Sequence, residues 1–230
     1  MWYTFAMSLY IVATPIGNLG DMTYRSIEVL KNVDYILCED TRTSKKLLDH
    51  YDISTPTRSY HAHSSERAHQ QVIDDLDQGL SIAIISDAGT PTISDPGVKL
   101  VDAVHRECDH IAVVPIPGAS ALMSALSVSG ITSSTFTFLG FLPHKKGRQK
   151  IFAYINELTH TAVCYESPHR IMKTLYSLQE VLDESRTIVI ARELTKLYEE
   201  VIRGNPKEVY EHFDKYPDSV RGEFVIIISA

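Results

Sequence analysis

The sequence has few cysteines and no long apolar run, which argues against several common classes of protein. Cysteine occurs three times in 230 residues, the three are far apart, and none forms a C-x-x-C pair. A disulfide framework is therefore not expected, and a reducing compartment, hence the cytoplasm, is the simpler interpretation. No apolar run approaches the ~18 residues that span a bilayer. The N-terminus has no basic region followed by an apolar one, so we expect no signal peptide, and Met7 offers an alternative start.

Basic residues are also in the minority. Lys and Arg number 22 against 29 Asp and Glu, which gives a formal charge of −7. A protein that coats nucleic acid is usually basic, so any contact with RNA must depend on a local patch. His61 and His63 lie two apart on one face of an expected strand, which invites a zinc hypothesis. No third ligand follows at a useful spacing, whereas a structural zinc site needs four, so we expect no metal.

The remaining composition is typical of a globular α/β protein, with 44% hydrophobic and 22% charged residues. Strand-like and helix-like segments alternate, which predicts a mostly parallel sheet with helices on its faces in the first half. The second half alternates too, with some antiparallel pairing. The segment Pro-Ile-Pro-Gly that ends at Gly118 is the best boundary, so we expect an N-terminal α/β domain over 1–116 and a C-terminal α/β domain over 117–230.

The elements themselves follow from periodicity, and Gly or Pro marks some of their ends, such as Gly79 and Pro206. The expected strands are 9–13, 35–38, 58–61, 82–85, 111–114, 136–141, 162–165, 187–191, 199–203 and 224–229. The expected helices are 23–31, 44–50, 65–78, the segment after Pro96, 119–128, 149–158, 169–182 and 206–213. The helix over 119–128 is apolar on nearly every side, as expected at a domain or subunit interface.

The most informative segment is the Gly/Pro-rich turn Ser-Asp-Ala-Gly-Thr-Pro-Thr-Ile-Ser-Asp-Pro-Gly at 86–97. It joins an expected buried strand to a helix, at the carboxyl end of the strand, where open α/β sheets bind ligands. Gly89 allows the backbone to come close to a ligand. Asp87 and Asp95 offer acceptors for hydroxyl or ammonium groups. The turn has neither the Lys-Ser/Thr ending of a P-loop nor a G-x-G-x-x-G spacing.

Two other loops follow strands of the first half. Ala-Thr-Pro-Ile-Gly-Asn-Leu-Gly-Asp at 13–21 is either a connection that needs glycines or a second ligand-facing loop, and we favour the latter because the adjoining strands look buried. Cys-Glu-Asp-Thr-Arg-Thr-Ser at 38–44 carries Glu39 and Asp40, which could act as a base or bind hydroxyls, and Arg42, which could bind phosphate. The same segment could instead only cap a helix, through its second Thr or its Ser.

Three motifs of the second half could likewise bind a ligand or serve only the local structure. Ser120 in Pro-Gly-Ala-Ser-Ala could bind an anion in the first turn of its helix or simply cap that helix. Tyr165 or Glu166, in Tyr-Glu-Ser-Pro-His-Arg, could face a pocket or only pack locally. Four of the six residues from Lys145 to Lys150 are basic. In an acidic protein this asymmetry indicates a polyanion contact, since cations at a helix N-terminus oppose its dipole.

These motifs, with Phe-Leu-Gly-Phe-Leu-Pro at 138–143 and Arg-Gly-Glu-Phe-Val at 221–225, occur in one order that resembles the tetrapyrrole methylase family, the class III S-adenosylmethionine (SAM) methyltransferases. The resemblance runs from about Leu9 to the last strand. It implies a two-domain α/β fold with a mostly parallel N-terminal sheet, a mixed C-terminal sheet and SAM in the cleft between them. It also implies a homodimer and, within the family, the branch that methylates the ribose 2′-hydroxyl of a cytidine in small-subunit ribosomal RNA.

The resemblance also implies which residues contact the cofactor, many of them through backbone groups. Those of the first half are Pro15, Asp87, Ala88, Gly89, Thr90, Pro91 and Ile93, followed by Ser120 and Ala121 at the domain boundary. Those of the second half are Tyr165, Glu166, Ala191, Arg192, Gly222, Glu223 and Phe224. A carboxylate such as Asp87 suits the ammonium or hydroxyls of SAM.

A methyl transfer to ribose needs alignment of the reacting atoms and removal of a proton from a weakly acidic hydroxyl. Asp40 is our first candidate for the proton acceptor, with Glu39 and Glu166 as the others. The expected RNA contacts are Arg42, Lys145, Lys146 and Arg148. Longer members of the family carry a segment beyond the last strand, and this chain stops at Ala230, which predicts a weaker hold on RNA by one chain; a dimer would pool two basic segments.

Two other functions remain open at this point. The same fold could methylate a small tetrapyrrole, as in corrin or sirohaem synthesis, although the basic stretch argues against it. The chain could also be a SAM-binding or RNA-binding module without catalytic turnover.

Overall fold

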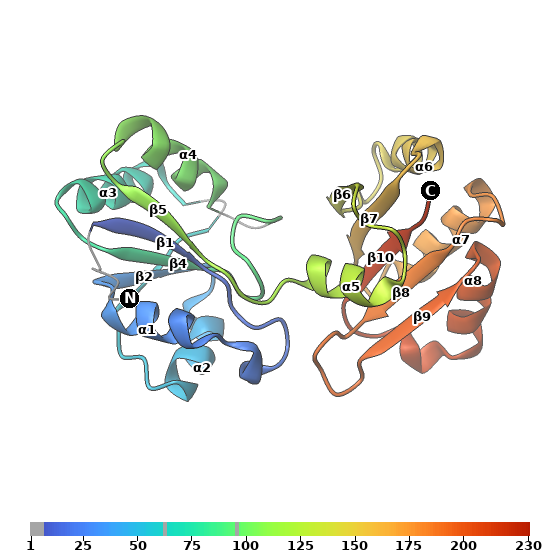
Figure 1. The fold of residues 1–230 in the computed structure, drawn as a ribbon, viewed down its shortest axis with the longest axis horizontal. Coiled ribbons are helices and arrows are strands. Elements are labelled where there is room, and N and C mark those ends of the chain that lie inside the picture. The colour runs from blue at the N-terminus through green and yellow to red at the C-terminus, as the bar shows by residue number, and fades with distance from the viewer. Residues whose placement is uncertain (1–6, 62–63, 95–96) are drawn as a thin grey trace. The chain divides into compact units, whose positions relative to one another are not determined.

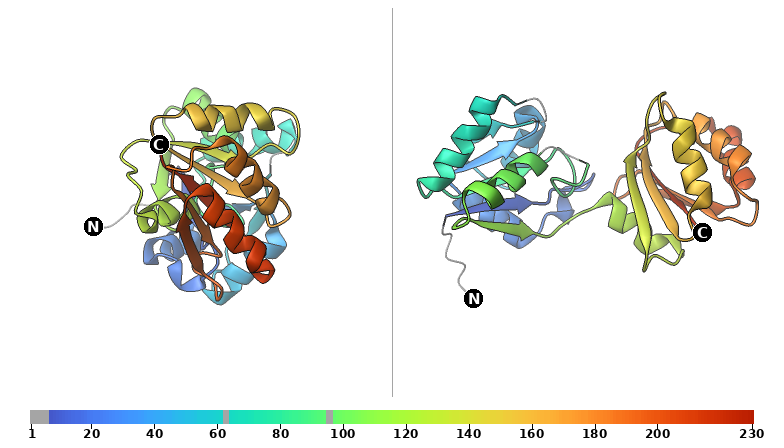
Figure 2. Two further views of the ribbon diagram at one scale, coloured as in Figure 1. Left: turned by 90° about the vertical axis from the view of Figure 1, so that its right-hand side faces the viewer. Right: turned by 90° about the horizontal axis from the view of Figure 1, so that it is seen from above.

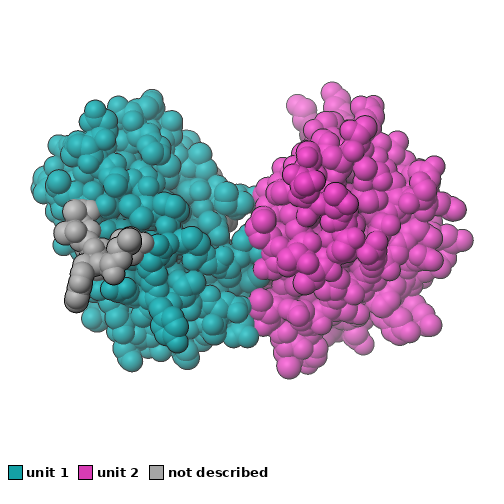
Figure 3. Space-filling model, in the orientation of Figure 1, with its two compact units in different colours: residues 1–120 teal, residues 121–230 magenta. Residues whose placement is uncertain are grey.

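The computed structural model describes residues 7–61, 64–94 and 97–230, so His63 and Asp95 lie outside the described residues. The chain forms two compact units, residues 1–120 and 121–230, which Figure 3 colours separately. The boundary expected between residues 116 and 117 falls shortly before this division. Among the described residues, no helix is long and apolar enough to cross a membrane.

Unit 1 is built on a parallel five-stranded sheet in the order β3-β2-β4-β1-β5. Figure 1 labels β1, β2, β4 and β5 of this sheet. The strands are β1 (Ser8–Val12), β2 (Tyr35–Cys38), β3 (Thr57–Ser59), β4 (Ile82–Ile85) and β5 (Ala112–Ile116). β2 and β4 are buried along their whole length, as expected for central strands covered on both faces.

Helices cover both faces of this sheet because successive strand side chains point to opposite sides. Leu9 and Ile82 pack in one core with α3 (Glu66–Asp77) and α4 (Val98–Glu107). Tyr10 and Ala83, the next residue along each strand, pack in the other core with α1 (Tyr24–Asn32) and α2 (Thr41–His50). A short 3-10 helix, η1 (Leu19–Asp21), precedes α1.

This connectivity makes the carboxyl edge of the sheet around β1 and β4 a topological switch point. β1 and β4 are neighbours, yet β1 leads to α1 on one face and β4 leads to α4 on the other. In open α/β sheets, ligands bind at such a point, outside the carboxyl ends of the strands. The predicted turns at 13–21 and 86–97 are these two loops.

Unit 2 has a mixed sheet in the order β6-β7-β10-β8-β9, in which only β6 and β7 are parallel. The strands are β6 (Phe136–Phe141), β7 (Thr161–Glu166), β8 (Ile188–Arg192), β9 (Glu200–Gly204) and β10 (Phe224–Ile228). The expected α/β architecture, with a parallel first sheet and a mixed second one, is therefore confirmed.

One face of the second sheet shares a core with α6 (Arg148–Glu157), α7 (Ile171–Val181) and α8 (Pro206–Lys215). α5 (Ala121–Ser129) lies on the other face, against β8, β9 and β10 (Figure 2). Its Leu122 and Leu126 are buried, whereas Met123 and Val128 are exposed within this chain. A second 3-10 helix, η2 (Pro217–Ser219), follows α8.

Candidate functional site

The loops after β1 and β4 are joined directly at the switch point. Thr14 and Gly89 exchange two backbone hydrogen bonds, from Thr14 N to Gly89 O at 2.9 Å and from Gly89 N to Thr14 O at 3.0 Å. The buried Thr14 hydroxyl donates to the Ser86 carbonyl at 3.1 Å. These bonds fix the start of the 86–97 turn against the residue that precedes Pro15.

The turn after β4 holds an unusual backbone. Thr92 and Ser94 have φ values of 72° and 66°, in the left-handed region that non-glycine residues rarely adopt. Between them Ile93 exposes 44% of its surface. Backbone strain of this kind persists where surrounding contacts enforce it, and it is concentrated at functional sites.

A third loop, after β5, joins the same edge. The Thr90 hydroxyl donates to the Ala119 carbonyl at 3.2 Å. A Cβ at Gly118 would lie 2.8 Å from the Cβ of Ala13, so the backbones of these two loops approach as closely as a glycine permits. These contacts join the three loops of unit 1 that carry its predicted cofactor residues, which are Pro15, Asp87, Ala88, Gly89, Thr90, Pro91, Ile93 and Ser120.

Asp40, the first candidate proton acceptor, is engaged elsewhere. It caps α2 by accepting from Arg42 N at 2.8 Å, and its two oxygens accept from Arg42 Nε at 3.1 Å and Nη2 at 2.7 Å. The expected caps, Thr43 and Ser44, lie inside the helix. Hydrogen bonds from the Arg42 side chain hold the pKa of Asp40 at about 2, so it is a weak base. Arg42 itself is exposed and paired with this carboxylate.

Glu39 lies in a different environment. It is half-buried and, within the described ranges, forms no ion pair. Burial raises the pKa of the Glu39 carboxyl, and the nearby Asp87 carboxylate raises it further, although His61 and a backbone hydrogen bond from Asp87 lower it. The Asp40 backbone N–H donates to Asp87 Oδ1 at 3.3 Å, so this pair of acids adjoins the turn after β4. Of the three predicted acceptors, Glu39 has the most suitable surroundings for a base.

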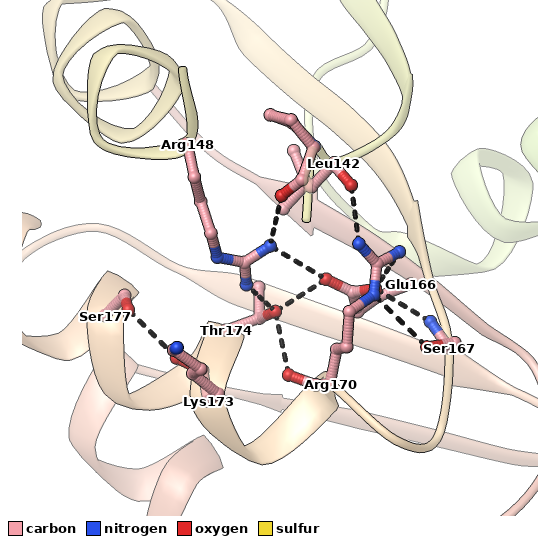
Figure 4. A network of polar contacts seen from close by, with 9 residues as sticks. Leu142, Arg148, Glu166, Ser167, Arg170, Lys173, Thr174 and Ser177 are labelled. Carbon is pink, nitrogen blue, oxygen red and sulfur yellow. Dashed lines mark hydrogen bonds and ion pairs between the residues drawn. The ribbon is translucent and has the colours of Figure 1, made fainter. Parts of the chain in front are cut away.

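Glu166, the third candidate, is saturated by donors in the interior of unit 2 (Figure 4). Its Oε1 accepts from Arg170 at 2.7 Å and from Ser167 N at 2.9 Å, and its Oε2 accepts from the Thr174 hydroxyl at 2.6 Å. Arg148 Nη1 lies 3.5 Å from Oε2. A fully buried carboxylate with these partners is poorly placed to take a substrate proton, so the structure argues against the prediction of Glu166 as a base.

Arg148 also corrects an expectation. The sequence grouped it with Lys145 and Lys146 as an RNA contact, but only 7% of its side chain is exposed and its guanidinium points inward to Glu166. The two lysines are exposed, as is Lys150. The exposed charge of the basic segment therefore comes from lysines alone.

The predicted cofactor residues of unit 2 lie at one end of three adjacent strands. Phe224 pairs in register with Glu166 on one side and with Arg192 on the other, and Val225 pairs likewise with Tyr165 and Ala191. The Tyr165 ring packs edge-on against two phenylalanines of β6, with centroids 5.0 Å and 5.4 Å away.

Arg192 is buried and contributes mainly to this local structure. Its Nε donates to the Arg221 carbonyl at 2.8 Å and its Nη1 lies 3.2 Å from Glu200. Gly222 has φ +89°, and a Cβ there would clash with the Glu193 side chain, which explains the glycine. Glu223 pairs with Lys196 at 2.9 Å. At this strand end the charged side chains are engaged by neighbours, so the backbone groups and the Tyr165 ring are what it offers to a ligand.

The residues present fit SAM in two respects. The Asp87 carboxylate is exposed beside closely packed backbone loops, which suits an ammonium or ribose hydroxyls. Exposed apolar surface at Ile93 suits the apolar parts of the molecule. Among the residues that the structure describes, no group of three or more His, Cys, Asp or Glu side chains could hold a metal ion.

Comparison with known proteins decides the family. The model of the Tetrapyrrole (Corrin/Porphyrin) Methylases matches residues 8–210. The chain belongs to the tetrapyrrole methylase family. Methyltransferases of this family use SAM, so the cofactor expected from the sequence is confirmed.

Curated relatives are similar over almost the whole chain. A ribosomal RNA small subunit methyltransferase I from Halalkalibacterium halodurans is 47% identical over 96% of this chain and 75% of its own length. The protein of that name from Haemophilus influenzae is 48% identical over 96% of the chain and 77% of its own length.

Solved structures share the fold at low identity. Cobalt precorrin-4 methyltransferase, a cobalamin biosynthetic enzyme, has a TM-score of 0.69 at 14% identity, over 97% of this chain and 95% of its own. Uroporphyrin-III-C-methyltransferase from Thermus thermophilus has a TM-score of 0.64 at 14% identity, over 96% of this chain and 94% of its own.

Sequence reasoning missed two features of the site. The Thr14–Gly89 bridge joins residues 75 positions apart, and no local pattern indicates it. The partners of Glu166 include Thr174, a helical residue that no motif singled out. The neighbouring Ser-Pro-His-Arg motif did contain Arg170, which is the one signal that could have indicated the network.

Proposed function

We propose that this chain transfers a methyl group from SAM to the ribose 2′-hydroxyl of a cytidine in small-subunit ribosomal RNA. The observation that carries the proposal is the identity of 46–48% with several proteins named ribosomal RNA small subunit methyltransferase I. The exposed lysines at 145, 146 and 150 support a polyanionic acceptor in an otherwise acidic chain.

The cofactor is proposed to bind at the two strand edges described above. In unit 1 the contacts are Pro15, Asp87, Ala88, Gly89, Thr90, Pro91, Ile93, Ser120 and, at the start of unit 2, Ala121. In unit 2 they are Tyr165, Glu166, Ala191, Arg192, Gly222, Glu223 and Phe224, with Glu166 and Arg192 acting through the backbone because their side chains are engaged. When bound, SAM supplies an electrophilic methyl group.

Glu39 is the proposed proton acceptor. A ribose hydroxyl must lose its proton as it attacks, and a half-buried carboxylate with a raised pKa accepts that proton better than Asp40, whose oxygens are held by Arg42. Arg42, Lys145 and Lys146 are proposed to contact RNA phosphates.

We further infer that two copies associate and that α5 contributes to the contact. Met123 and Val128 of this helix are 56% and 53% exposed, which is unusual for a helix so rich in apolar residues. Sedimentation velocity should give the mass of a dimer, and a monomer at micromolar concentration would contradict this inference.

The test of the function is transfer of tritiated methyl from SAM to purified small ribosomal subunits that lack this modification. We expect label in ribose 2′-O-methyl groups of the RNA. Label transferred to a tetrapyrrole precursor but not to RNA would favour the alternative acceptor. SAM binding without transfer to either acceptor would indicate a non-catalytic module.

A further inference from the structure

The buried network around Glu166 reaches the loop that carries the exposed lysines. Arg170 Nη2 contacts Glu166 at 2.7 Å, and its Nη1 donates to the Leu142 carbonyl at 2.7 Å. Arg148 Nη1 lies 3.5 Å from Glu166 and donates to the Pro143 carbonyl at 3.1 Å. Each arginine therefore connects the end of β7 to the backbone immediately after β6 (Figure 4).

The network is internal and nearly complete. Exposed side-chain fractions are 0% for Glu166, 7% for Arg148 and 16% for Arg170. Arg148 Nη2 also donates to the Thr174 hydroxyl, and that hydroxyl donates to Glu166. Charges buried with their partners are held in one geometry, because any other arrangement leaves a charge without a partner.

The same network anchors both ends of the basic loop. Leu142 and Pro143 stand before the exposed residues 144–147, and Arg148 stands directly after them as the first residue of α6. Gly147 has φ +86°, and a Cβ on it would meet no atom within 4 Å, so this residue makes the turn between the anchors in open space. Lys145 and Lys146 thus lie on a short loop with two fixed ends.

We propose that Arg148 and Arg170 are positioning residues that hold the 144–147 loop so that Lys145 and Lys146 meet the phosphates of the acceptor RNA. This inference rests on the proposed function. Arg148 and Arg170 both point inward and share the Glu166 carboxylate, so the two lysines are the charges that this loop exposes. A loop held in place before binding loses less conformational entropy when it binds, and this increases affinity.

The test measures binding of purified small ribosomal subunits over a range of salt concentrations. It compares the full chain with Arg148→Gln, with Lys145→Ala/Lys146→Ala, and with the triple variant. Lys207→Ala, which removes an exposed lysine of α8, is the matched control. Arg148→Lys keeps the buried charge but not the forked set of N–H donors. It takes the place of Arg148→Gln in the comparison if that variant does not fold.

We expect Arg148→Gln and the lysine double variant each to lose about tenfold in affinity and to reduce the salt slope by about 1.5, as expected for two phosphate contacts. The triple variant should lose little more than either, because all three remove one interaction. Arg148→Lys should lie between the wild type and Arg148→Gln, and Lys207→Ala should match the wild type.

Different results overturn different claims. Wild-type affinity and salt slope in folded Arg148→Gln or Arg148→Lys, with a weakened lysine variant, would overturn the positioning role and leave the proposed function standing. Losses in the triple variant that equal the product of the separate losses would also overturn it. A wild-type chain that neither binds nor methylates the subunits would overturn the proposed function instead.

Discussion

Two adjacent carboxylates after β2, Glu39 and Asp40, differ sharply in acidity for local reasons. Asp40 caps a helix and is held by the Arg42 fork, which lowers its pKa to about 2. Glu39 is half-buried beside Asp87, and burial raises its pKa. The acidity of each of these carboxyl groups therefore depends on its neighbours rather than on its residue type.

Replacing Glu39 with Gln tests its role as the base. We expect kcat to fall by about 10² to 10⁴, the usual contribution of general base catalysis, with little change in SAM affinity. The carboxylate is active when deprotonated, so wild-type kcat should fall as the pH drops through its raised pKa, above the range of an ordinary Glu. Asp40→Asn is the matched control and should keep most activity and the same acid limb; a pH–rate profile unchanged in Glu39→Gln would contradict the assignment.

Gly118 tests the packing of the cofactor loops. A methyl group at this position would lie 2.8 Å from the Cβ of Ala13, so Gly118→Ala should displace the loop that carries Pro15. We expect calorimetry to show at least about tenfold weaker SAM binding, which corresponds to a loss of about 1.4 kcal/mol in binding free energy. Gly20→Ala, which would meet only the movable end of Asn18 at 3.2 Å, should bind SAM normally. Equal affinity in both variants would show that these loops do not form the cofactor site.

At the scale of elements, the buried Glu166 network joins β7, α6, α7 and the segment immediately after β6 (Figure 4). Three elements and one loop of this unit therefore depend on one carboxylate. Its side chain contributes to the fold and to the shape of the site edge, where Tyr165 lies next to it in the chain.

Glu166→Gln should destabilise the protein strongly. The change leaves Arg148 and Arg170 buried without a counter-charge, which costs about 3–5 kcal/mol. Urea unfolding should reveal this loss, whereas Glu180→Gln, an exposed change on α7, should have almost no effect. A Glu166→Gln protein of wild-type stability but without turnover would instead restore Glu166 as a catalytic group.

The sequence allowed accurate prediction of elements whose signal is local. The bounds 35–38 and 82–85 match β2 and β4, because central strands read as short continuous apolar runs. The start of α2 was predicted too late, because Asp40 caps it, whereas Thr43 and Ser44 were the expected caps. Arg148 looked like a surface cation because its partner Glu166 lies on another element. Pairings between distant segments, such as Thr14 with Gly89, leave no periodic pattern in the sequence from which they could be predicted.

At the scale of the whole molecule, the chain combines a parallel and a mixed sheet, each with a loop-rich strand edge. The family assignment accounts for this architecture and for the cofactor, and the curated relatives match 96% of the chain. The choice of acceptor is what separates the proposed function from tetrapyrrole methylation on the same fold.

The most direct measurement is nucleoside mass spectrometry of small-subunit RNA after incubation of unmodified subunits with this chain and trideuteromethyl-SAM. The account predicts one labelled 2′-O-methylcytidine per RNA molecule, reduced by about 10² or more with Glu39→Gln. Label on a base, label on another nucleoside, or no labelled RNA from a chain that binds SAM would contradict it.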